Sequence, residues 1–315
     1  MDGDPSSKMS RASIVTMLVA AELAVVSLAI WSLGGRTTFA AGLHPVEFRA
    51  TTIAPLAAGV TPAVVIDDPR SRVRVGESDD GLVHVADLTQ MRGAIFSSAR
   101  YSQLRVTRTA DGVRIERPDP PRIQIDLFGF STQAIEVNVP QGAHVEIVRC
   151  SGADVTGIVG GVSVRSQDGH VSLARLDGNV DARSDDGYVE ARDVRGDRLA
   201  MTSMDGHLSL QDVAVGSLLA TTHDGRIEAN GLSLRGERPD ATLRTDEGSI
   251  RLDLLPGANV TVSASTADGR IVVDGSSDRA DASQRTIQLG TGAGKLTVGT
   301  ADGSIHIFTN GASLQ

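Results

Sequence analysis

The sequence predicts an all-β fold, a stacked-rung β-solenoid resembling a β-helix, preceded by one N-terminal transmembrane helix. Three observations indicate this class. One nine-residue pattern, as in TSMDGHLSL at 202–210, occurs seven times. Apolar and polar residues alternate on both sides of each copy, as they do in strands that bury one face. The one long apolar run is SIVTMLVAAELAVVSLAIWSLGG, at 13–35.

The composition suits many short strands joined by glycine turns. The chain has 315 residues and 34 glycines, and only 3% of its residues are aromatic. The formal net charge is −9, and residues 1–36 are neutral, with three acids and three bases. Because an acidic surface repels phosphate backbones, nucleic acid is not an expected partner. The single cysteine, Cys150, predicts a buried and unreactive thiol, with a reactive thiol or an intermolecular disulfide as the alternatives.

Residues 13–35 are long enough to span a hydrocarbon core of about 30 Å as a helix. We therefore expect a single-pass membrane protein with residues 1–12 in the cytoplasm and the remainder periplasmic or extracellular. Glu22 lies in the middle of the span, where a carboxylate is costly. We expect so apolar a run to tolerate it, with protonation or pairing in an oligomer as the alternatives. A cleaved signal peptide ending at Ala40 is the alternative, and it also exports the rest of the chain.

Between the anchor and the repeats the sequence has two parts, of which only the second shows polar–apolar alternation. Residues 36–62 are interpreted as a linker, and residues 63–150 as the N-terminal β-strand region of the solenoid, because short alternating segments are separated by turn residues. Residues 89–103 do not alternate and are expected to form an irregular loop or a short helix. The prolines of RPDPPR, at 117–122, predict a turn because proline lacks the donor that a ladder needs.

The repeats occupy residues 151–308, followed by a tail at 309–315. Each copy carries an [ST]-x-[DE]-G turn, and the glycines are separated by 18, 19, 19, 23, 21 and 34 residues. Periods of this size indicate a repeat architecture in which one copy forms one rung, that is, one winding of the coil. The turn residues are Asp168, Gly169, Asp186, Gly187, Asp205, Gly206, Asp224, Gly225, Glu247, Gly248, Asp268, Gly269, Asp302 and Gly303.

A hydroxyl residue stands three positions before every one of these glycines. The period of two places this position on the apolar face, where an unbonded hydroxyl is costly. Stacked rungs explain the pattern if each hydroxyl bonds to an adjacent turn or to its neighbour in a column. An antiparallel meander of hairpins is the rival arrangement. The inward hydroxyl column is Ser166, Ser184, Ser203, Thr222, Thr245, Thr266 and Thr300.

A coil also needs a second corner in each rung and caps at both ends. The terminal GASLQ or Phe308 is expected to cap the far end. The span of 34 residues before Gly303 leaves the register of the last rung open. The second-corner candidates are Asp177-Gly178, Gly196, Gly216, Gly236, Pro256-Gly257 and Gly294.

No catalytic, cofactor-binding or metal-binding residues are predicted. The turn acids form a ladder of like charge, for which local bonding to turn backbone is expected and cation binding between rungs is the alternative. His170 and His207 share an outward column with Tyr188 and Arg226. Two rungs separate the histidines by about 10 Å, which is too far for one metal ion, so we expect surface residues.

The repeats and the segment before them resemble the bacterial putative-adhesin family, a β-strand-repeat domain of unknown function. AIEVNVPQGAHVEI, at 134–147, is similar to the family's I-x-V-P-x-G-x-x-V step, and the tandem turns follow it. The resemblance covers about residues 63–307. It implies a membrane-tethered β-solenoid outside the cytoplasm with a role in adhesion or envelope function, and it carries no catalytic residues.

The sequence therefore predicts a non-catalytic protein, without cofactors, that presents a rigid surface for adhesion or envelope interaction. Its expected partners are the membrane, through residues 13–35, and an envelope protein or cell-wall glycan. The oligomeric state is left open. The alternatives are a polysaccharide-cleaving β-helix enzyme of the envelope and an envelope sensor or assembly scaffold.

Overall fold

The structure is a computed structural model that describes residues 61–88, 104–118, 132–274 and 283–309 in full. It also gives the backbone of four further strands. The part of the chain that it describes contains no helix suited to crossing a bilayer, and the predicted anchor at 13–35 lies outside the described residues. The four strands for which the structure gives the backbone are β1 (Thr38–Ala40), β2 (Arg49–Ile53), β6 (Gln90–Ser97) and β9 (Gln124–Thr132).

The described elements are all strands, and they divide into two compact units. In the smaller unit, β1, β6 and β9 form a three-stranded sheet in that order, with β1 antiparallel to β6. The segment 89–103, expected as a loop or short helix, therefore contains a strand at Gln90–Ser97. This expectation was wrong because β6 includes no regular polar–apolar alternation that would identify a strand.

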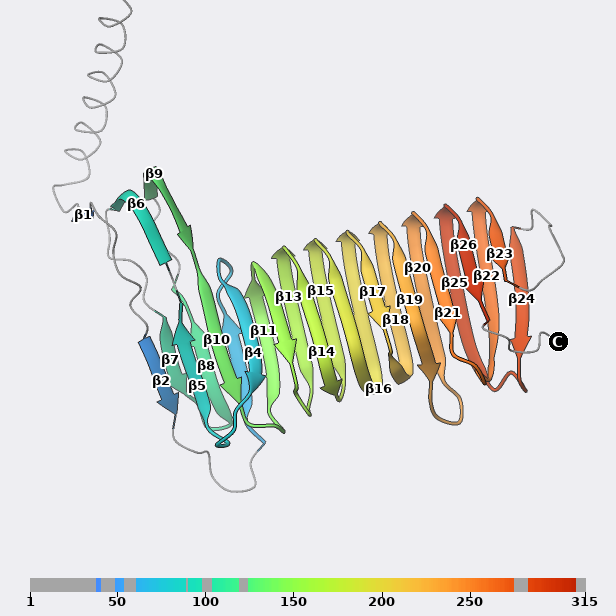
Figure 1. The fold of residues 1–315 in the computed structure, drawn as a ribbon, viewed down its shortest axis with the longest axis horizontal. Coiled ribbons are helices and arrows are strands. Elements are labelled where there is room, and N and C mark those ends of the chain that lie inside the picture. The colour runs from blue at the N-terminus through green and yellow to red at the C-terminus, as the bar shows by residue number, and fades with distance from the viewer. Residues whose placement is uncertain are drawn as a thin grey trace, which may run out of the picture. The chain divides into compact units, whose positions relative to one another are not determined.

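The larger unit is a coil whose windings lie on one another, so that its strands form two stacks (Figure 1). In spatial order the first stack is β7 (Arg105–Arg108), β8 (Gly112–Glu116), β3 (Ala63–Asp67), β11 (His144–Cys150), β13 (Val162–Asp168), β15 (Val180–Asp186), the second half of β16 (Val189–Asp205), β18 (Ala214–Asp224), β20 (Asp240–Glu247), β25 (Gly294–Asp302), β22 (Val260–Asp268) and β24 (Gln284–Leu289).

The second stack runs along the other side of the core. In order it is β2, β5 (Val83–Asp87), β10 (Ala134–Val139), β4 (Arg72–Glu77), β12 (Gly152–Thr156), β14 (Val171–Asp177), the first half of β16, β17 (Leu208–Gln211), β19 (Ile227–Leu234), β21 (Ile250–Leu254), β26 (Ile305–Phe308) and β23 (Ile271–Val273).

Pairing between the repeated rungs is parallel throughout, which excludes the antiparallel meander. The inward side chains of the two stacks form one continuous core of Val, Leu, Ile and Ala. The alternation in the sequence is the reason, because it gives each strand one buried face. In the second stack, one core column is Val171, Val189, Leu208, Ile227, Ile250, Ile305 and Ile271.

The last two repeats are stacked out of sequence order. Thr300 on β25 pairs with Thr245 on one side and with Thr266 on the other, so the seventh copy lies between the fifth and the sixth. After β23 the chain returns as β24, antiparallel to β22, before β25 enters the gap. This extra strand accounts for the 34 residues between Gly269 and Gly303.

The return strand also caps the coil. β24 is the last strand of the first stack, whereas β26, which contains Phe308, lies inside the second stack between β21 and β23. The expectation that Phe308 caps the end was therefore wrong. Its ring instead lies 4.3 Å from the guanidinium of Arg251 on the neighbouring rung. Most of the tail, residues 310–315, falls outside the described residues.

The second corner of the central rungs begins with a residue in the left-handed region. Arg175, Asp193 and Asp212 have φ of 53°, 51° and 55°, and Gly231 stands at the same place one rung further with φ of 71°. This conformation turns the next residue of each rung back into the core. The residues so buried are Leu176, Val194, Val213 and Leu232.

Candidate functional site

The acid-glycine turns form the first corner of every rung, and their glycines stack backbone on backbone. A Cβ built on Gly206 would lie 1.9 Å from the carbonyl oxygen of Gly187, and one on Gly225 would lie 2.0 Å from that of Gly206. Gly248 repeats the contact at 2.0 Å on Gly225. The close approach of successive turns therefore requires glycine, in addition to the positive φ of turns such as that at Gly169.

The predicted hydroxyl positions lie in one buried file behind these turns. The hydroxyl of Thr222 lies 3.1 Å from the carbonyl oxygen of Gly206, and that of Thr300 lies 3.1 Å from the carbonyl oxygen of Gly248. Each threonine of the file thus donates to the turn of the adjacent rung. Thr245 has three carbonyl oxygens within 3.2 Å, on His223, Gly225 and Glu247. Thr266 lies 3.2 Å from the carbonyl oxygen of Gly303.

The serines of the file behave differently. Ser166 makes one long hydrogen bond, of 3.4 Å, to the carbonyl oxygen of Cys150. The buried hydroxyls of Ser184 and Ser203 have no hydrogen-bond partner in the structure. A threonine has a stiff χ1 angle because it is branched at Cβ, whereas a serine hydroxyl can rotate away from the turn. Each hydroxyl was expected to bond to the adjacent turn or to its neighbour in the column, and this expectation therefore fails at Ser184 and Ser203.

The acids of the turns form a second file, on the exposed side of the first corner. Register pairs such as Asp168 with Asp186 and Asp205 with Asp224 run along it. Within the described ranges, no three His, Cys, Asp or Glu side chains gather as metal ligands would. The file is therefore a line of like charges held at the spacing of the strands.

Next to the acids runs the outward column that begins at His170. Tyr188 stands between His170 and His207 in rung order, and its ring stacks on that of His170, with centroids 4.9 Å apart and planes 13° apart. The Nδ1 atom of His207 accepts a hydrogen bond of 3.3 Å from the backbone N–H of Arg226. The planar side chains of His170, Tyr188 and His207 therefore occupy successive rungs along the first corner. The two histidines do not share a site.

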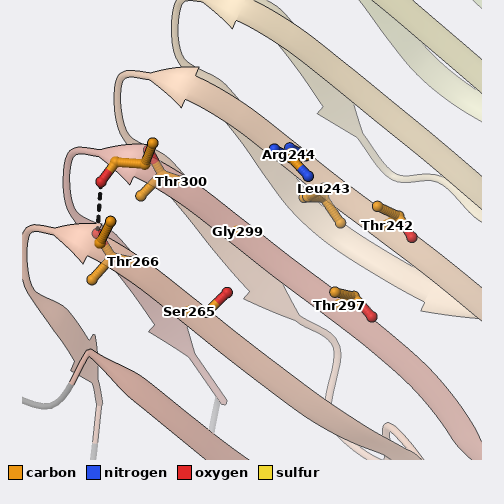
Figure 2. A pocket seen from close by; sticks show the side chains of 10 residues that line it. Thr242, Leu243, Arg244, Ser265, Thr266, Thr297, Gly299 and Thr300 are labelled. Carbon is orange, nitrogen blue, oxygen red and sulfur yellow. Dashed lines mark hydrogen bonds between the residues drawn. The ribbon is translucent and has the colours of Figure 1, made fainter.

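A hollow of about 440 Å³ opens where the last three rungs of the first stack meet (Figure 2). We call it the Gly299 depression, because this residue of β25 has no side chain there. Arg244 pairs with Gly299 on one side and Ser265 does so on the other. The lining is Thr242, Leu243, Arg244, Ser265, Thr266, Ala267, Thr297, Gly299, Thr300 and Ala301. Sequence analysis missed this site, because the neighbours of Gly299 become known only with the order of the rungs.

The thiol of Cys150 lies in the core, at the head of the hydroxyl file, where it pairs with Ser166. Burial raises the pKa of Cys150, since desolvation disfavours the thiolate. Its Sγ lies 3.5 Å from the carbonyl oxygen of Arg165. A neutral, enclosed thiol of this kind is a structural residue and a poor nucleophile.

Comparison with known families decides what this coil is. A family model described as Toastrack DUF4097 matches residues 63–308, the part of the chain that runs from β3 to β26. The chain belongs to the Toastrack DUF4097 family. This Toastrack assignment covers the same segment as the resemblance seen in the repeated turns, which is therefore confirmed.

Two crystal structures similar to this Toastrack chain come from bacteria. A putative cell adhesion protein from Clostridium sporogenes is 10% identical, with a TM-score of 0.28 over 83% of this chain and 99% of its own. A putative adhesin from Bacteroides fragilis is 12% identical, with a TM-score of 0.34 over 84% of this chain and 100% of its own. No curated protein matches this Toastrack chain.

Proposed function

We propose that this Toastrack protein is a non-catalytic surface-presenting module of the cell envelope. Residues 13–35 tether it to the membrane, and the coil is displayed in the periplasm or outside the cell. Its partner is a cell-wall glycan or an envelope protein. One observation carries the proposal: outward side chains of successive rungs are held in register by continuous parallel ladders, as in the stacked pair His170 and Tyr188.

This arrangement favours binding over chemistry. A solenoid contacts only its neighbouring windings, so its surface is rigid and repeats at the spacing of the strands. A macromolecule with its own repeat can then contact several rungs at once, which adds affinity without any deep pocket. Glycoside hydrolysis commonly uses two carboxyl groups that flank the scissile bond. The lining of the Gly299 depression includes none.

The test is a binding screen of the full chain, purified in mild detergent, against insoluble cell-wall material and solubilised envelope proteins. We expect the folded chain to sediment with one of these fractions and the heat-unfolded chain not to. The same incubation is assayed for released sugars. Sugar release without retention of the protein would replace this proposal by the polysaccharide-cleaving alternative. If neither sugar release nor retention is observed, the proposed function is refuted.

A further inference from the structure

The Gly299 depression interrupts a column of side chains that otherwise continues along the exposed face of the first stack. Each position pairs with the next in the parallel register. Before the depression every member carries an outward arginine or threonine, and beyond it stands a serine. The column is Arg165, Arg183, Thr202, Thr221, Arg244, Gly299 and Ser265. The column thus lacks one side chain within the hollow.

The backbone does not require glycine at this position. The φ angle of Gly299 is not positive. A Cβ built on this residue would have Ser265 Oγ as its nearest atom, at an ordinary contact distance of 3.6 Å. At the first corner the same test places a Cβ 1.9 Å from a backbone oxygen, as at Gly206. Glycine inside a strand costs about 0.5–1 kcal/mol relative to alanine. An open space at Gly299 is therefore a feature of the surface that folding does not demand.

The lining of the depression combines polar side chains with small apolar groups. Arg244 stands on the β20 side, and Thr242, Thr297 and Ser265 line the hollow from three neighbouring strands (Figure 2). Gly299 and Ala301 of β25 add a bare backbone and a methyl group to the lining. A volume of about 440 Å³ lies within the range of small-molecule sites.

The charges around the depression favour an uncharged ligand. The guanidinium of Arg244 already has a carboxylate partner, with Nη2 at 3.4 Å from Asp246 Oδ1. The chain as a whole carries a net charge of −9, which repels a polyanion. Arg244 nevertheless has five N–H donors in a planar fork, and each hydroxyl can both donate and accept. This set matches a ligand that offers several hydroxyl groups and a compact apolar C–H face.

We propose that the Gly299 depression binds one unit of a neutral saccharide, with Arg244, Thr242, Thr297 and Ser265 as its hydrogen-bonding partners. The inference rests on the proposed function, because it names the chemical class of the glycan and the place on the coil where it is held. The guanidinium donates to adjacent sugar hydroxyls, and the three hydroxyl side chains complete the set. The sugar's C–H face lies over Gly299 and Ala301.

The experiment measures binding of chitotetraose, maltotetraose and the carboxylated tetragalacturonate to the full chain by isothermal titration. Gly299→Thr places in the gap the residue that the column has at Thr221, so a side chain that the strand accepts projects into the hollow. We expect this variant to weaken binding of the neutral oligosaccharides at least roughly tenfold, while its unfolding temperature is unchanged or raised. Arg244→Met is expected to weaken binding roughly tenfold, by removal of charged donors.

Arg183→Met is the matched control, since Arg183 belongs to the same column but lies outside the depression. It is expected to bind as the unaltered chain does. The inference is overturned if Gly299→Thr binds as tightly as the unaltered chain, if tetragalacturonate is preferred, or if no neutral oligosaccharide binds. Retention on cell-wall material or on envelope proteins in any of these cases leaves the proposed function standing, and loss of retention on both fractions refutes the proposed function as well.

Discussion

Arg117 donates a hydrogen bond from Nε to Oδ2 of Asp68 across 2.6 Å, with both side chains excluded from solvent. Asp68 also accepts from the hydroxyl of Ser71, and the Nη2 atom of Arg117 reaches Asp87 at 3.0 Å. The network joins the turn after β3 to the ends of β5 and β8. Burial lowers the pKa of Arg117, but the bonds to Asp87 and Asp68 outweigh it, so this pKa is raised overall. The charged network thus holds the N-terminal strands of the coil together.

Removing one partner of this buried pair is expected to be costly. Arg117→Met removes the cationic partner of Asp68 in the interior, so we expect the free energy of unfolding to fall by about 3–5 kcal/mol. Arg149→Met is the control, because Arg149 pairs with Asp67 at 2.7 Å but is half-exposed, and an exposed pair contributes at most about 1 kcal/mol. Urea unfolding measures both. Equal losses would show that burial does not govern the network.

The hydroxyl file predicts opposite effects at two positions. Thr245→Val removes a hydroxyl that has three carbonyl oxygens within reach, and it is expected to lower the free energy of unfolding by about 1–2 kcal/mol. Ser184→Ala removes a buried hydroxyl without a partner and is expected to leave stability unchanged or raised. Ser184→Thr should gain the bond to the adjacent turn. A larger loss for Ser184→Ala than for Thr245→Val would contradict the bonding pattern.

The glycines of the first corner and of the exposed face should respond differently to a methyl group. Gly206→Ala places a Cβ against the carbonyl oxygen of Gly187, which only separation of the rungs can relieve. We expect a loss of roughly 3 kcal/mol or more. Gly299→Ala places its Cβ at ordinary contact distances, 3.6 Å from Ser265 Oγ and 4.0 Å from the Ser265 carbonyl oxygen, and should gain about 0.5–1 kcal/mol. Thermal unfolding of the two variants, side by side with the unaltered chain, compares them directly.

The second corner offers a stabilising change. Arg175 has a φ of 53°, in the left-handed region, which costs a residue with a side chain roughly 1–2 kcal/mol. Arg175→Gly is therefore expected to raise the free energy of unfolding by about 1 kcal/mol. Asp212→Gly should gain less, since aspartate tolerates this region better. Arg183→Gly, in an extended strand, serves as the control and should lower stability. No gain at Arg175 would refute the strain.

His223 provides a pH-dependent contact on the surface. Its Nδ1 lies 2.8 Å from Oδ2 of Asp246, and this hydrogen bond, with the charge of Asp224, raises the pKa of His223. The pKa of Asp246 is lowered, chiefly by the same bond. The contribution of His223 to stability is full below the ordinary histidine pKa of about 6.5 and is lost as pH rises through the raised value. That of Asp246 is lost as pH falls through its lowered pKa.

The pair is therefore formed by two charges only between these two pKa values. Because both side chains are exposed, we expect the effect on stability to be small. NMR titration of the histidine ring measures it directly. Asp246→Asn should bring the pKa of His223 back toward its ordinary value, whereas Asp181→Asn, remote in the sequence of rungs, should not. An unchanged pKa in Asp246→Asn would show that the contact is not formed in solution.

Much of the repeat could be read from the sequence because its signals are local. The alternation around Gly206 identifies which side chains point inward, and the recurrence of acid and glycine locates the first corner. The strand β6 escaped this reasoning because residues 90–97 carry no alternation. The pair Arg117 and Asp68 could not be predicted, because 49 residues separate the two and the sequence around each residue gives no signal of its partner.

By itself the sequence determined the shape of each winding: its two strands, its buried face, and the file in which the threonine or serine stands. Only the tertiary structure decided which windings touch, and so placed Thr300 between Thr245 and Thr266. The physical reason is that every repeat offers its neighbours the same register. Local chemistry therefore cannot rank the possible orders. The return of β24 along β22, and the gap it leaves for β25, selects one of them and creates the exposed space at Gly299.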